Sequence, residues 1–117
     1  MPHATERFPT YAWKLRDAYG TTIVYASDVA RLTDRFRRFC RRATLLIVDG
    51  AMWRRRLLSH LTIDEALPEL ATWSVDAILL TQIGRTAPPH AELVERVRKP
   101  CPRARPAYDG MVVTVVP

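Results

Sequence analysis

Glycine is scarce in this sequence, with four residues among 117. The glycine-rich motifs of P-loop phosphate sites, of Rossmann dinucleotide sites and of α/β-hydrolase nucleophile elbows are all missing. We therefore exclude those three kinds of site. Cysteine is also rare, because only Cys40 and Cys101 occur and they are far apart. Two isolated cysteines make neither a disulfide framework nor a CxxC metal site. Cys40 falls on the apolar side of a predicted helix, where we expect a buried thiol.

Long hydrophobic runs are absent as well. No apolar stretch approaches the roughly 20 residues that a membrane span needs, and the first residues, MPHATERFPTYAW, lack the apolar core of a secretory signal. We therefore expect a cytoplasmic protein without a membrane partner. Hydrophobic residues still make up 48% of the chain and charged residues 26%, which is typical of a globular protein. The length of 117 residues predicts one small domain, residues 1–117.

Lysine is nearly missing among the cations, because two of the 18 are Lys and the other 16 are Arg. The formal net charge is +6 and the sequence pI is about 10.0. The excess lies in two clusters, Arg35, Arg37, Arg38, Arg41 and Arg42, then Arg54, Arg55 and Arg56. Such clusters attract phosphate backbones, so nucleic acid is one possible partner. The alternative is a solvated helix face, because no aromatic residues interleave the arginines as a base-stacking platform would require.

Apolar and β-branched segments predict the strands. Residues 21–26, 44–48 and 77–80 read as buried strands, and residues 10–15 as an edge strand that forms a hairpin with 21–26. A second hairpin is expected at the end of the chain. Its strands would be residues 104–108 and 111–116, joined by a tight turn at Asp109-Gly110.

Helical periodicity appears between these strands. An apolar stripe runs from Val29 to Cys40, and Thr62-x-x-Glu65 forms a capping box ahead of a second helix, which Pro68 should kink or shorten. Pro88-Pro89 precedes a third helix, and residues 51–59 suggest a basic helical turn. Strands that alternate with helices predict an α/β fold with a mixed β-sheet and flanking helices.

Three of the predicted strands end in an acid or an amide: Asp28, Asp49 and Gln82. Layered α/β proteins bind ligands beyond the ends of their strands, at the rim of the sheet. This shared pattern is the best indication of a site that the residues alone provide. Asp28 has two interpretations, as a carboxylate ligand of a metal or as the N-cap of the helix that follows, and capping is the more common role.

The three histidines, His3, His60 and His90, form no metal motif by spacing. No pair has the spacing HxH, HxxxH or HExxH, and a hydrolytic zinc site needs at least three protein ligands. A zinc site would therefore have to be assembled from distant residues, with Asp28 as its carboxylate.

Longer segments of the sequence resemble a known family. TIVYASD, LLIVDGAMW, SHLTIDEAL, AILLTQIGR and AYDGMVVTV, in this order, resemble the second half of a metallo-β-lactamase-fold hydrolase of the ribonuclease Z and phosphodiesterase-like branch. The similarity extends from about His3 to Val116. It implies half of a four-layered αββα sandwich, with a dinuclear metal site, usually zinc, at the rim of the sheets.

The resemblance also implies roles for single residues. Asp28 matches the family's bridging carboxylate, which touches both metals, and His3 resembles a histidine ligand that precedes the first hairpin. His60 matches a histidine near the metal site, for which a catalytic role is implied. Gln82 stands in the place of the last histidine ligand, usually written LTH. His90, eight residues further on, is an additional candidate metal ligand.

Two departures from the family pattern bear on activity. The HxHxDH motif, which supplies most metal ligands and the water-activating Asp, belongs to the first half of the family's domain and does not occur in this chain. Gln82 offers a neutral amide, which is a weaker zinc donor than imidazole. We therefore expect a truncated fold with little or no hydrolase activity alone, in a family whose intact members use two zinc ions to hydrolyse phosphodiesters or esters.

Half a sandwich leaves one apolar face of its sheet to be covered. The partners that we expect are a second copy of this chain or a separately encoded N-terminal half. Two other functions stay open. One is a non-catalytic binding or assembly module that keeps the fold without the metals, and the other is a basic RNA-binding protein that uses the arginine clusters.

Overall fold

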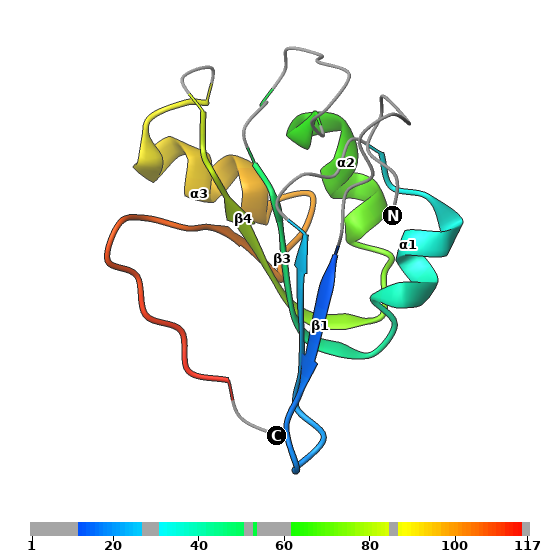
Figure 1. Cartoon of the computed structure of the whole chain (residues 1–117). Helices are drawn as coiled ribbons and strands as arrows, with labels where there is room; N and C mark the ends of the chain where they lie inside the picture. The colour runs from blue at the N-terminus through cyan, green and yellow to red at the C-terminus, as the bar shows by residue number, and fades with distance from the viewer. Residues whose placement is uncertain (1–11, 27–30, 51–52, 54–61, 85–86, 116–117) are drawn as a thin grey trace, which may run out of the picture.

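Strands and helices alternate along the chain in a computed structural model, which describes residues 12–26, 31–50, 53, 62–84 and 87–115 (Figure 1). The elements in chain order are β1 (Trp13–Arg16), β2 (Thr22–Ala26), α1 (Asp34–Phe39), β3 (Ala43–Asp49), α2 (Ile63–Leu70), β4 (Val75–Thr81), α3 (His90–Arg98) and β5 (Ala104–Pro106). Among the described residues, none of the helices has the length and apolar character of a membrane span.

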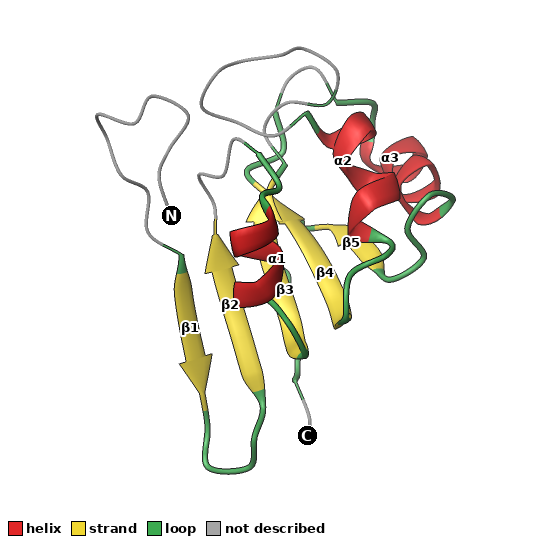
Figure 2. Cartoon of the chain, turned by 90° about the vertical axis from the view of Figure 1, so that its right-hand side faces the viewer, coloured by secondary structure: helices red, strands yellow, loops and turns green. Residues whose placement is uncertain are grey.

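One mixed sheet contains all of these strands, in the spatial order β1-β2-β3-β4-β5 (Figure 2). β1 is antiparallel to β2 through the hairpin that the sequence predicts, and β2 to β5 run parallel. Parallel neighbours need crossover connections, which here contain α1, α2 and α3. The predicted α/β class with a mixed sheet and flanking helices is therefore confirmed.

One face of the sheet packs against the helices. The register sets Val24, Leu46 and Ile78 side by side on this face, and all three are fully buried. A core cluster joins them to buried residues of α1, α2 and α3. Phe36 of α1 contacts Trp73 edge to face, with 5.6 Å between the ring centroids. This contact fixes α1 against the turn that follows α2.

Side chains alternate between the two faces along a strand, and in this sheet the side chains on the opposite face are apolar as well. We call it the open face, and its residues are Trp13, Leu15, Ile23, Tyr25, Leu45, Ile47, Ala77 and Leu79. Trp13 is 64% exposed, Leu15 61% and Tyr25 41%, whereas Leu45 and Leu79 are buried. Residues 107–115 run on this side of the sheet, away from α1 and α2 (Figure 1). The exposed part of the open face therefore lies over β1 and β2.

The structure corrects the start of the first helix. α1 begins at Asp34, and the hydroxyl of Thr33 caps it by accepting a hydrogen bond from the backbone N–H of Phe36 at 3.0 Å. The prediction of a helix from Val29 with Asp28 as its cap is wrong, because Thr33 and the acid that follows it are a better N-terminal signal. Asp28 and Val29 themselves lie outside the described residues.

The second helix begins where the sequence predicts, although its cap differs. The side chain of Thr62 makes no capping hydrogen bond. Its backbone carbonyl instead accepts from the N–H groups of Glu65 and Ala66. The helix contains Pro68 and ends at Leu70, which agrees with the expectation of a short helix. The basic helical turn predicted over 51–59 falls almost wholly outside the described residues.

The predicted C-terminal hairpin is wrong. β5 ends at Pro106 and is parallel to β4, and residues 107–115 form no strand. The turn at Asp109-Gly110 is present, with Gly110 at φ 80° and the N–H of Met111 bonded to the carbonyl of Tyr108 at 3.0 Å. A strand needs a paired edge, and the three-residue β5 ends in a proline that has no N–H to donate.

Candidate functional site

The carboxyl ends of β2, β3 and β4 meet at one edge of the sheet, which we call the rim. Register pairs Asp49 of β3 with Thr81 of β4, and Ala26 of β2 lies beside the residue before Asp49. The strand-ending residues Asp49 and Gln82 therefore lie at the same edge, as the sequence predicts. Asp28, two residues beyond Ala26, lies outside the described residues.

Asp49 is a buried polar residue of the rim. Its exposure is 0%, although it is an acid at the end of a strand. It has the same parity along β3 as Leu45 and Ile47, so its side chain belongs to the open-face side of the sheet. A buried carboxylate requires a compensating partner, and Asp49 does take part in such an interaction. The rim therefore holds a carboxylate where the open face ends.

Gly50 lets β3 and β4 approach each other closely at the rim. Its N–H donates to the carbonyl of Thr81 at 2.6 Å. A Cβ at this position would lie 2.9 Å from that carbonyl oxygen, 2.9 Å from Cδ1 of Ile83 and 3.1 Å from Cβ of Leu80. Such distances are shorter than van der Waals contact, so only glycine fits here without a shift of the backbone. The Asp-Gly pair thus ends the strand and sets the shape of the rim.

Gln82 follows β4 directly and is exposed. Its φ of 57° lies in the left-handed region, which costs a residue with a side chain about 1–2 kcal/mol. The strand therefore ends sharply, and the amide stands at the surface of the rim. The predicted role of Gln82 as a metal ligand stays a prediction.

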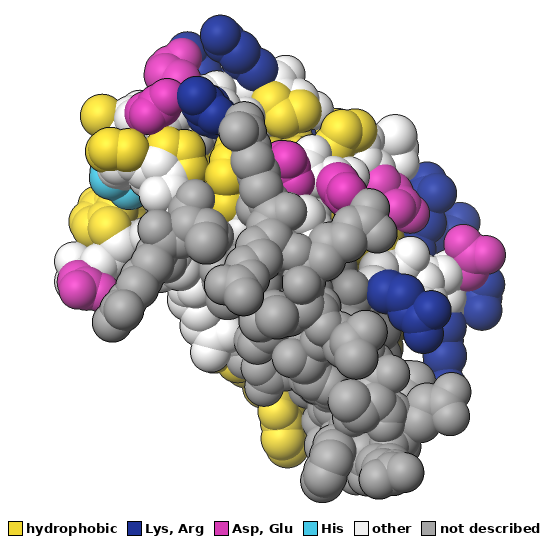
Figure 3. Space-filling view, turned by 90° about the horizontal axis from the view of Figure 1, so that it is seen from above, with side chains coloured by type: hydrophobic (Ala, Val, Ile, Leu, Met, Phe, Trp, Pro, Cys, Tyr) yellow, Lys and Arg dark blue, Asp and Glu magenta, His cyan; other side chains and the backbone are white. Residues whose placement is uncertain are grey.

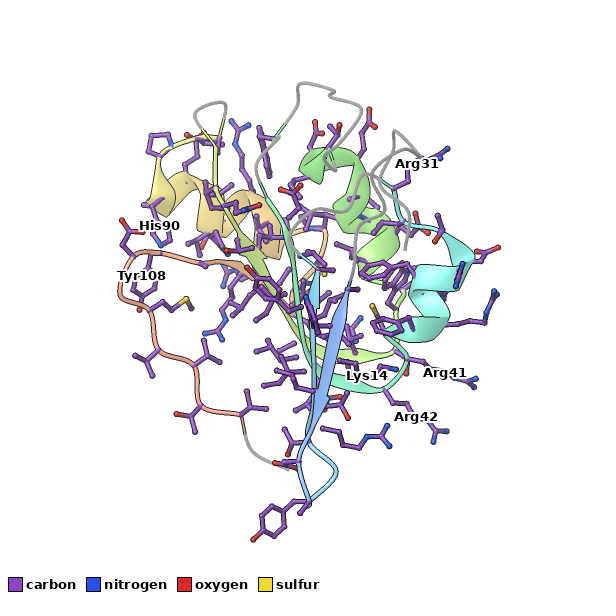
Figure 4. The ribbon with its side chains drawn as sticks, in the orientation of Figure 1. Lys14, Arg31, Arg41, Arg42, His90 and Tyr108 are labelled. Carbon is purple, nitrogen blue, oxygen red and sulfur yellow. The ribbon has the colours of Figure 1, made fainter. Side chains whose placement is uncertain are left out.

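His90 is the first residue of α3 and follows the N-cap Pro89, as the proline pair predicts. Its ring packs edge to face against Tyr108, with 5.7 Å between the centroids (Figure 4). The contact ties the start of α3 to the segment after β5. Its predicted role as an additional metal ligand is not tested by this contact.

Three of the predicted site residues, His3, Asp28 and His60, lie outside the described residues. Within the described ranges, no group of three or more His, Cys, Asp or Glu side chains could hold a metal. Among its described residues the rim offers the carboxylate of Asp49, the hydroxyl of Thr81 and the amide of Gln82, and these residues include none of the imidazoles and thiolates of which most zinc sites are made. This donor set does not fit a dinuclear zinc centre by itself.

The two cysteines are unsuited to metal binding and to nucleophilic catalysis. Both are free and buried, which confirms the prediction for Cys40. Burial raises the pKa of the Cys40 thiol to about 12, against a smaller lowering by Lys14. Burial also raises the pKa of Cys101, although Arg103 opposes the change. Thiols that stay protonated are poor nucleophiles and poor metal ligands.

The chain is similar in sequence to a known protein family. Residues 1–83 match the family described as the β-lactamase superfamily domain. The chain belongs to the β-lactamase superfamily. The matched range includes β1 to β4 and the rim, so superfamily membership extends to the strand ends described above. No match was found among curated proteins.

A solved structure supports the superfamily fold. The chain is similar to the metallo-β-lactamase fold protein YhfI from Bacillus subtilis, with a TM-score of 0.69 and 22% sequence identity. The alignment covers 86% of this chain and 42% of YhfI. The chain therefore has a partial metallo-β-lactamase fold and spans less than half the length of that relative.

Sequence reasoning placed Asp49 among the strand ends at the rim but assigned it no ligand or catalytic role, and it assigned no role to Gly50. The signal was present, because an apolar strand that ends in Asp-Gly places an acid at the rim and a glycine where two strands converge. What the sequence could not provide is the complete burial of Asp49, which depends on packing across several segments.

Proposed function

We propose that this chain is one half of a metal-dependent hydrolase of phosphodiester or ester bonds, and that it has little or no hydrolase activity alone. The observation that carries the proposal is the position of the open face, which ends at the rim beside Asp49. A second α/β layer packed on the open face would set its own side chains next to the strand ends. The alignment covers 42% of YhfI, which agrees with this chain forming about half of such a fold.

The proposed metal is zinc, supplied with ligands mainly by the second half. His3, Asp28 and Gln82, and His90 as a further candidate, are the ligands proposed from this chain, with His60 in a catalytic role nearby. The described rim does not form a zinc site, so we derive no catalytic step from it. Bound zinc would lower the pKa of a water molecule and so provide a hydroxide nucleophile.

The test measures the metal content of the 117-residue chain by plasma mass spectrometry, together with turnover of bis-p-nitrophenyl phosphate in added zinc. We expect less than one tightly bound zinc per chain and turnover near background. Any turnover should be compared with that of Asp28→Asn, which separates activity of this chain from a contaminant. Stoichiometric, tightly bound zinc with substantial turnover that Asp28→Asn abolishes would contradict the proposal.

A second candidate is a non-catalytic binding or assembly module. It is favoured by the exposed amide at Gln82 and by a described rim that lacks a metal-binding group. This function requires that the fold be stable without metal. The module requires equal unfolding midpoints with and without a strong chelator, and a marked loss of stability on chelation would rule it out.

A further inference from the structure

A cluster of arginines surrounds α1, on the side of the sheet opposite the open face. We call the following residues the basic surface: Arg31, Arg35, Arg38, Arg41 and Arg42. All five are exposed. Arg31, Arg41 and Arg42 extend outward from the ends of α1 (Figure 4). Seen from above, Lys and Arg side chains gather at the right-hand edge of the molecule (Figure 3).

The arginines of α3 differ from those of the basic surface because they form ion pairs with acids of the same helix. Arg96 pairs with Glu92 at 2.8 Å and Arg98 pairs with Glu95 at 2.7 Å, so the charges of α3 are neutralised along the helix. In the part of the chain that the structure describes, no arginine of the basic surface makes an ion pair. Residues 31–42 contain six arginines, the five of the basic surface and Arg37, against one acid, Asp34. The excess of positive charge is self-repulsive, so an anionic partner would stabilise it.

Neighbouring cations have structural contacts of their own. Arg37 donates to the carbonyl of Thr72 at 3.3 Å, and the ammonium of Lys14 lies 4.4 Å from the centre of the Phe39 ring. These contacts hold α1 against β1 and the turn after α2. The basic surface is therefore a fixed array on packed elements, and Arg35 and Arg38 lie on the same side of the helix because they are three residues apart.

The chemistry of the array favours phosphodiesters. The guanidinium group binds phosphate oxygens in a bidentate manner, which the ammonium group of lysine cannot do. No exposed large hydrophobic residue lies between 31 and 42, so this surface has neither an apolar wedge for a lipid bilayer nor aromatic rings for stacking on bases. A partner recognised by its backbone charge alone fits these features.

We infer that the basic surface binds the phosphodiester backbone of nucleic acid without regard to base sequence. The surface lies on the helical side of the sheet, so the open face stays accessible when it is occupied. The inference is therefore independent of the proposed hydrolase half, and either can fail without the other.

The experiment titrates the full chain into fluorescent single-stranded oligo(U) RNA and into a DNA duplex, and it follows anisotropy at several salt concentrations. Arg38→Gln/Arg41→Gln is compared with Arg96→Gln/Arg98→Gln, which lowers the net charge equally on α3. For RNA we expect the first double variant to flatten the dependence of log K on log salt by about 1.4, since each phosphate contact contributes about 0.7. We expect the α3 variant to retain the wild-type slope. The comparison of the RNA and DNA titrations shows which nucleic acid the basic surface binds more tightly.

Arg38→Lys/Arg41→Lys keeps the charge and should restore most of the salt dependence, and Arg35→Gln tests the same surface should Arg38→Gln/Arg41→Gln not fold. Three results would overturn the inference. One is the absence of binding to both nucleic acids at low salt, and another is an equal loss in the α1 and α3 variants. The third is binding to anionic phospholipid vesicles but not to either nucleic acid, which would assign the surface to a membrane.

Discussion

At the scale of single residues, Gln82 combines an exposed side chain with a backbone conformation that is unfavourable for residues other than glycine. Its φ of 57° is a conformation that glycine adopts freely and that β-branched residues avoid. A substitution here changes backbone strain while it removes little packing, because the side chain is exposed. The position can therefore be tested for strain separately from any ligand role.

We expect Gln82→Gly to raise the free energy of unfolding by up to about 1 kcal/mol, because relief of about 1–2 kcal/mol of left-handed strain outweighs the chain entropy that glycine adds. Gln82→Val should lower it by about 1–2 kcal/mol, since a β-branched side chain is worst in this conformation. Urea denaturation followed by tryptophan fluorescence measures both. Equal stability of the two variants would show that φ at this position is not strained in solution.

The sequence predicted that Gln82 lies at the rim, but it did not predict the positive φ angle of this residue. The end of an apolar run at Thr81-Gln82 marks the rim, and the structure places the residue there. Propensity alone would not assign a left-handed φ to glutamine. Gln82 comes directly after Thr81, whose carbonyl accepts the hydrogen bond from Gly50 of the neighbouring strand, and a local sequence pattern does not show how the backbone continues from such a contact.

At the scale of elements, Arg103 connects β5 to the start of β4. Its guanidinium donates to the carbonyl of Val75 at 2.5 Å and to the carbonyl of Ala71 at 2.7 Å. Its own carbonyl accepts from the N–H of Ile78 at 3.0 Å. A three-residue edge strand has few ladder hydrogen bonds, so this side chain supplies much of what holds β5 in the sheet.

Arg103→Ala should lower the free energy of unfolding by about 2–3 kcal/mol, because it removes two hydrogen bonds from a charged donor and leaves two carbonyls without that partner. Arg105→Ala is the matched control. Arg105 is exposed on the same strand, so its replacement should cost less than about 0.5 kcal/mol. Urea denaturation of the three proteins gives the comparison, and similar losses in both variants would contradict the role assigned to Arg103.

The elements differ in how far the sequence could predict them. β2, β3 and β4 are apolar and β-branched, so local composition was enough to find them. The start of α1 was missed because the apolar stripe continues upstream of its real cap at Thr33. Residues 111–116 have the composition of a strand, yet 111–115 are not paired. A strand requires an edge, and composition does not say whether one is present.

At the scale of the whole molecule, the two faces of the sheet have different surroundings. One is covered by α1, α2 and α3, and the open face leaves Trp13, Leu15 and Tyr25 exposed over β1 and β2. Contiguous apolar surface of this kind marks an interaction site in soluble proteins. A stable interface buries about 800 Å² per partner, so an interface on this face has to extend beyond the three exposed side chains of β1 and β2. A second copy of the chain is the partner present in a pure sample.

We therefore expect the purified chain to self-associate through the open face, and Tyr25→Lys to shift it toward the monomer, because a lysine would be buried without a partner in the interface. Tyr19→Lys is the matched control, since Tyr19 is also exposed and lies in the turn between β1 and β2, away from the open face. Size-exclusion chromatography with light scattering reads the mass of each protein. A well-folded wild-type monomer at every concentration tested would contradict association through this face. It would also contradict the argument that a second α/β layer packs on the open face.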